Sequence, residues 1–133
     1  MALNSDQLQA VYRMSDAGQD NQALSLLAQL HDSAETGEEK AHLLLAESRC
    51  LSRLGKVAES QKSLKAVAKL KVSDGATNAA SELMSALNFR LLGEHKRALK
   101  ILTGIPAKYS EVMREHAWFR RDVNAEIAFT KVT

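Results

Sequence analysis

The 133-residue sequence has one proline, one cysteine and no apolar run long enough to cross a membrane. A spanning helix needs about 20 such residues, so we expect no membrane segment. The first residues lack the basic and then apolar order of a signal peptide. A single cysteine excludes an internal disulfide and fits a reducing compartment, so we expect a cytoplasmic protein.

The sequence also lacks a strong excess of either charge. It has 18 Lys and Arg residues against 16 Asp and Glu residues, a net charge of +2. A helical-repeat protein that binds RNA usually has a larger basic excess, so nucleic acid is not the partner we expect.

What the sequence does contain is a high proportion of helix-forming residues. Hydrophobic residues make up 45% of the chain and charged residues 26%, which is typical of a globular protein. Many Ala, Leu, Lys, Glu and Gln residues, with six glycines, favour helix almost throughout. The length suits one domain, so we predict a single all-α domain over residues 1–133.

Three glycines divide the chain into similar segments. Gly18, Gly55 and Gly93 are 37 and then 38 residues apart, and each lies between two apolar-striped stretches. A period in the 30s is the signature of stacked helix pairs. The sequence predicts antiparallel pairs at about residues 4–31, 37–71 and 75–105, followed by one capping helix at about 107–129.

Residues that begin or end helices mark the boundaries. Asn4 is expected to cap the first helix, and Thr36 with Glu39 forms a capping box for the third. Gly18 is expected to end the first helix in the left-handed conformation. The Gly104-Ile105-Pro106 stretch predicts that the sixth helix ends near Thr103.

These features resemble the tetratricopeptide repeat (TPR) family. The family places a glycine at the turn, a small residue five positions later and a large apolar residue four positions earlier. The resemblance implies that the three pairs stack as a right-handed superhelix. The usual aromatic residue of the first helix and the closing proline of each repeat are absent. The matching positions are Gly18, Gly55 and Gly93; Ala23, Ser60 and Ala98; and Met14, Leu51 and Phe89.

No residue pattern indicates catalysis or a cofactor. The four histidines are far apart in the sequence, and none has a metal-ligand spacing. Cys50 and His42 are eight residues apart on one predicted helix, so Cys50 is expected to be a buried thiol rather than a nucleophile. We therefore expect no enzyme, no catalytic residues, no bound metal and no cofactor.

The resemblance implies a partner-binding groove along the first helix of each pair. Its apolar centre and its arginines suit a peptide with hydrophobic anchors and a carboxylate, which predicts a protein-binding adaptor or chaperone. Two alternatives are that the groove leucines belong to the core and that the C-terminal helix fills the groove. The predicted groove residues are Leu8, Tyr12, His42, Leu45, Arg49, Arg53, Leu83, Leu87 and Arg90.

Two other functions remain open. An apolar face left exposed by only three repeats would support a homodimer. Lys62, Lys65 and Lys69, with the C-terminal arginines, would support nucleic-acid binding, although a solvated helix face explains the lysines more simply. Of the adjacent aromatic residues Trp118 and Phe119, one is expected to pack on the sixth helix.

Overall fold

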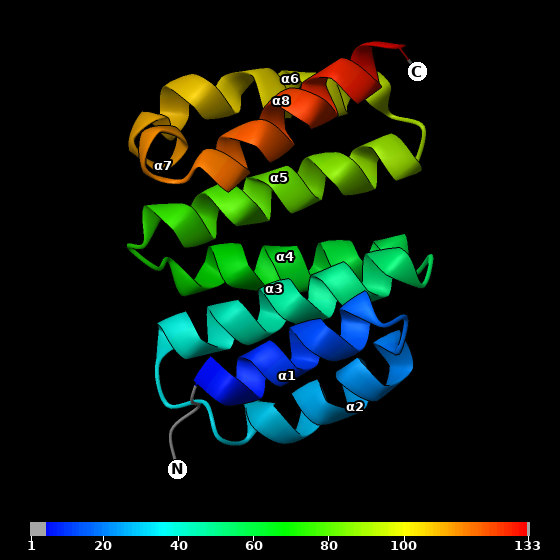
Figure 1. The fold of residues 1–133 in the computed structure, drawn as a ribbon, viewed down its shortest axis with the longest axis vertical. Helices are drawn as coiled ribbons and strands as arrows, with labels where there is room; N and C mark the ends of the chain where they lie inside the picture. The colour runs from blue at the N-terminus through cyan, green and yellow to red at the C-terminus, as the bar shows by residue number, and fades with distance from the viewer. Residues whose placement is uncertain (1–4, 133) are drawn as a thin grey trace. The chain divides into compact units, whose positions relative to one another are not determined.

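The structure, a computed structural model, describes residues 5–132 and confirms the all-α prediction. The described residues form eight helices and no strand (Figure 1). The helices are α1 (Ser5–Asp16), α2 (Asp20–His31), α3 (Gly37–Arg53), α4 (Val57–Leu70), α5 (Gly75–Leu91), α6 (His95–Lys108), α7 (Ser110–Glu115) and α8 (Ala117–Val132).

The helices fall into two compact units. Unit 1 ends at Val72 and contains α1 to α4, and unit 2 begins at Ser73 and contains α5 to α8. In unit 1, α2 packs against both α1 and α3, and α3 also contacts α1 and α4. In unit 2, α6 packs against α5, α7 and α8, and α8 also contacts α5. The expectation of a single domain stays a prediction.

The three predicted turns have the same geometry. Gly18, Gly55 and Gly93 have φ angles of 79°, 80° and 84°, the left-handed conformation that glycine adopts at low cost. The residue after each glycine donates its N–H to the carbonyl of the residue four positions before the glycine, at 2.8 Å in each turn. This is the Schellman arrangement, so each large apolar residue at that earlier position accepts the turn's closing hydrogen bond. These residues are Met14, Leu51 and Phe89.

The small residues five positions after the glycines lie where two helices meet. Ala23, Ser60 and Ala98 are completely buried, and each donates its N–H at 3.0 Å to the carbonyl just after the glycine. A larger side chain at these positions would push the paired helices apart. Each sequence period therefore corresponds to one helix pair, and the turn has the same conformation in all three pairs.

The predicted start of the third helix is confirmed. The Thr36 hydroxyl accepts the Glu39 N–H at 3.1 Å, and the Glu39 carboxylate accepts the Thr36 N–H at 3.2 Å. These reciprocal bonds satisfy amides that the helix itself leaves free. The proposed Asn4 cap lies outside the described residues.

The prediction that the sixth helix ends near Thr103 is wrong. Helix α6 continues through Gly104 and Pro106 to Lys108. Proline removes only the N–H that would have bonded to the Leu102 carbonyl, and this loss falls in the last turns of the helix. The buried side chains of Leu102 and Ile105 stabilise the helical path by packing in the unit 2 core.

The predicted single C-terminal helix is two helices. Helix α7 ends at Glu115, His116 is extended with φ −122° and ψ 91°, and α8 begins at Ala117. The prediction assumed one continuous helix over about residues 107–129. The break allows short α7 to contact α5 while α8 packs along α6.

Each unit has its own hydrophobic core. The unit 1 core joins α1, α2 and α3, and the unit 2 core joins α5, α6, α7 and α8. The core of unit 1 contains Val11, Ala23, Leu27, Leu30, Leu43, Ala46 and Cys50. The core of unit 2 contains Ala79, Ala86, Ala98, Leu102, Ile105, Met113, Phe119 and Val123.

Candidate partner-binding site

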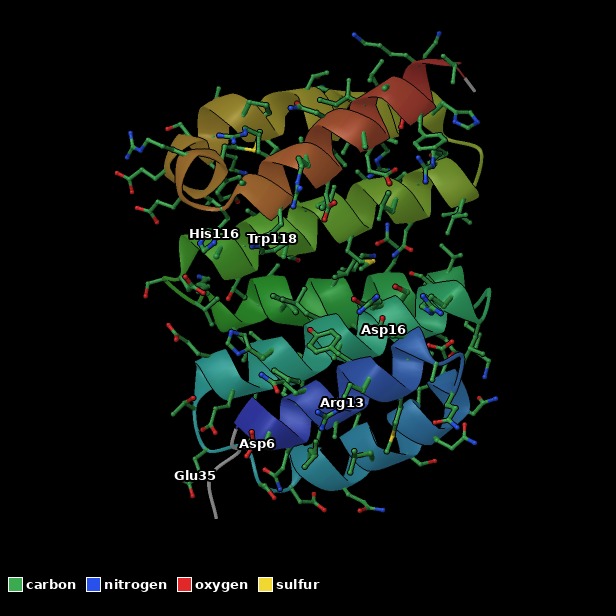
Figure 2. All side chains as sticks on the ribbon, in the orientation of Figure 1. Asp6, Arg13, Asp16, Glu35, His116 and Trp118 are labelled. Atoms are coloured by element: carbon green, nitrogen blue, oxygen red, sulfur yellow. The ribbon has the colours of Figure 1, made fainter. Side chains whose placement is uncertain are left out.

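Helices α1 and α3 bring three polar or aromatic side chains together in unit 1. Arg49 Nη2 donates to Asp16 Oδ1 at 2.8 Å, and the guanidinium carbon lies 5.5 Å from the centre of the Tyr12 ring. Figure 2 labels Asp16 at the end of α1, beside α3. Burial raises the pKa of Tyr12 although the Arg49 charge opposes this shift. We call Tyr12, Asp16 and Arg49 the α1–α3 cluster.

A second arginine of the predicted groove is also paired within unit 1. Arg53 Nε lies 3.3 Å from the Asp20 carboxylate, which accepts a 2.6 Å hydrogen bond from the Ser15 hydroxyl. Burial raises the pKa of Asp20, but the hydrogen bonds from Ser15 and Arg53 outweigh it and leave that pKa below its ordinary value. Buried Asp20 is thus held as a carboxylate between buried Ser15 and exposed Arg53.

The other predicted groove residues of unit 1 are only partly exposed. Leu8, His42 and Leu45 are half-buried, and Leu8 packs against the unit 1 core. Leu8 therefore lies at the edge of the core rather than fully on the surface. Tyr12 and Arg49 remain the half-buried groove residues that contact each other.

The predicted groove residues of unit 2 lie on α5. Leu83 is partly buried against the unit 2 core, and Leu87 is half-buried. The Arg90 guanidinium binds the Glu126 carboxylate of α8 and lies 5.9 Å from the centre of the Phe129 ring. Two α8 residues, Glu126 and Phe129, thus lie against the Arg90 side chain.

The sequence analysis missed the acidic partners of all three arginines. Asp16 and Asp20 each lie 33 residues before their arginine, and Glu126 lies 36 residues after Arg90. These separations differ from the 37- and 38-residue repeat period, so a search for opposite charges one period apart would not have found them. Each arginine of the proposed groove has its charge balanced by a neighbouring helix.

Outside this cluster, the remaining candidates for chemistry are the cysteine and the metal-ligating types of side chain. Cys50 is buried, and burial raises the pKa of its thiol, which disfavours the reactive thiolate. No group of three or more His, Cys, Asp or Glu side chains among residues 5–132 has an arrangement that could hold a metal ion. Within the same residues, no helix is both long and apolar enough to cross a membrane.

The remaining predicted surface residues behave as expected. Phe119 is buried in the unit 2 core, whereas Trp118 is exposed. Lys62, Lys65 and Lys69 are exposed on α4, as a solvated face requires.

Burial and a hydrogen bond with Glu82 raise the pKa of Tyr109, a residue that the sequence analysis did not single out.

No protein-family model, curated protein or solved structure matches the chain. The resemblance to the TPR family therefore stays a prediction that rests on the turn glycines and on the residues around them.

Proposed function

We propose that the chain is a non-catalytic helical-repeat adaptor of TPR-like, right-handed architecture that binds a peptide or partner segment along the first helices of its pairs. The observation that carries the proposal is the α1–α3 cluster. It presents an aromatic ring, a cation and a carboxylate on two neighbouring first helices.

The cluster suits a polar anchor of a bound peptide. A guanidinium has five N–H donors, and Arg49 donates from Nη2 to Asp16. Asp16 and the Tyr12 ring restrict the position of the guanidinium, so less side-chain entropy is lost when a ligand binds. A peptide carboxylate or carbonyl would accept hydrogen bonds from the remaining Arg49 donors, and half-buried Leu45 would contact apolar side chains.

The ion pair between Arg49 and Asp16 affects which ligands the cluster can bind. Asp16 competes with a ligand carboxylate for Arg49, so the cluster favours ligands that also form apolar contacts over simple anions. Removing the Asp16 charge should strengthen the binding of an acidic peptide, while reversing the Arg49 charge should weaken it.

The test is a selection from a random peptide display library, followed by affinity measurements on the selected peptides. Arg49→Glu and Asp16→Asn both break the same ion pair, so they form a matched set. We expect Arg49→Glu to weaken binding at least about tenfold and Asp16→Asn to retain or tighten it. Failure to select any peptide, or equal binding by wild type and Arg49→Glu, would refute the proposed site.

A further inference from the structure

The outer side of α8 carries an exposed apolar stripe. Trp118, Phe129 and Val132 expose 53%, 61% and 82% of their surface, and Ala125 between them is also exposed. At about 100° per residue, these four side chains lie within about 60° of one another around the helix. We call Trp118, Ala125, Phe129 and Val132 the outer stripe.

The outer stripe gives α8 a second apolar side. Phe119, Val123 and Thr130 face the interior of unit 2 and are buried. A helix with apolar residues on opposite sides is typical of a helix that is covered on both sides. Within unit 2, the Trp118 ring has an edge-to-face contact with Phe119 and lies near His116, and the Arg90 guanidinium lies 5.9 Å from the centre of the Phe129 ring. Figure 2 shows His116 and Trp118 side by side where α8 begins.

The two ends of the stripe lie symmetrically about Ala125. Trp118 lies seven residues before Ala125, and Val132 lies seven residues after it. When two identical helices pack antiparallel around a two-fold axis, residues equally far from the axis on either side face each other. With the axis at Ala125, Trp118 of each copy would face Val132 of the other, and the two small Ala125 side chains would allow close approach. Phe129 of each copy would face the exposed Arg121 of the other, where a cation–π contact can form.

We infer that the outer stripe is a self-association surface, and that its occupant is the α8 helix of a second copy of this chain, packed antiparallel. A two-fold interface requires a patch that is complementary to itself, and the large-small-large order of the stripe meets that requirement. This surface is separate from the α1–α3 cluster, so the inference does not depend on the proposed function.

The size of the stripe indicates a weak dimer. Each of the three large side chains exposes on the order of 100 Å², so one copy would bury roughly 400 Å² including the alanine and flanking methylenes. The total from two copies, roughly 800 Å², lies below the roughly 1,200 Å² that stable specific interfaces bury. We therefore expect reversible association that depends on protein concentration.

The sole tryptophan lies in the proposed interface and provides a direct probe. Sedimentation equilibrium and Trp118 fluorescence would be measured together from about 1 μM to about 1 mM protein, a range that covers weak dimers. We expect the mass to rise from the 14.6 kDa of one chain toward twice that value. The Trp118 emission should shift to shorter wavelength over the same concentration range, because dimerisation removes the indole from water.

Ala125→Glu is the decisive variant. Ala125 is exposed in a single copy and glutamate is a good helix former, so the fold should be unaffected. At the proposed axis the substitution would place two carboxylates face to face, and we expect the dissociation constant to rise at least about tenfold. Ala58→Glu, at an exposed position of α4, is the matched control and should dimerise like the wild type.

Three results would overturn the inference. The wild type could remain monomeric at about 1 mM, which would also be the result if the stripe bound only a different partner. Association could persist unchanged in Ala125→Glu. The mass could also rise with no change in Trp118 emission, which would place the interface elsewhere.

Discussion

Exchanging glycine for alanine at two positions in unit 2 should change its stability in opposite directions. Gly93 ends α5 with φ 84°, whereas Gly104 lies inside α6 without a positive φ. A Cβ atom added at either glycine would meet nothing within 4 Å, so steric crowding does not distinguish them. The difference between the two substitutions is therefore one of backbone conformation.

The expected magnitudes follow from that conformation. An L-residue in the left-handed region costs about 1–2 kcal/mol, and the stiffer unfolded chain of alanine offsets about 0.4–1 kcal/mol of this. Gly93→Ala should therefore lower the free energy of unfolding by about 1 kcal/mol. Gly104→Ala should raise it by about 1 kcal/mol, because glycine is that much poorer than alanine in a helix interior.

Urea unfolding followed by Trp118 fluorescence is the assay, because the single tryptophan lies in unit 2. With a slope of about 1 kcal/mol/M for a unit of this size, the urea midpoint should fall by about 1 M in Gly93→Ala and rise by about 1 M in Gly104→Ala. If Gly93→Ala raised the midpoint or left it unchanged, the assignment of Gly93 as an obligatory left-handed cap would be refuted; a fall in Gly104→Ala would contradict the helix-interior reasoning for Gly104.

Two further predictions concern buried groups. Leu102→Ala removes a side chain that is 1% exposed and should cost about 2–4 kcal/mol in the same urea assay, whereas Leu92→Ala at a half-exposed position should cost under about 0.5 kcal/mol. Because the folded-state pKa of Asp20 is lowered, its ionised form stabilises unit 1 above about pH 4, and this contribution is lost as the pH falls further. Thermal unfolding followed by helical circular dichroism between about pH 5 and pH 2 should therefore show a shallower loss of stability in Asp20→Asn than in wild type, and equal slopes would contradict the pairing with Arg53.

The sequence by itself determined the helix pairs, because the signals that define them are local. The signals are glycines that adopt a positive φ, the capping residue Thr36 and small residues at helix contacts. Each of them acts on residues only a few positions away in the sequence. Such features are legible without knowledge of the rest of the chain. Gly18, Gly55 and Gly93 accordingly mark turns of the same conformation.

Packing between helices determined where α6 ends and where the C-terminal helix breaks, which the local signals predicted wrongly. Pro106 and Gly104 disfavour helix locally, but burial of Leu102 and Ile105 keeps α6 helical beyond them. The single helix predicted over about residues 107–129 breaks at His116, and its two parts pack against α5 and α6 as separate helices.

The pairing of the arginines in the candidate site also depends on contacts between residues that are far apart in the sequence. The sequence nominated Arg49, Arg53 and Arg90, but their acidic partners lie 33 to 36 residues away on other helices. Local patterns contain no information about which charges meet across helices, so only the packed structure identified the pairs. The same holds for Trp118 and Phe119, adjacent in sequence, since docking of α8 buries one ring and leaves the other exposed.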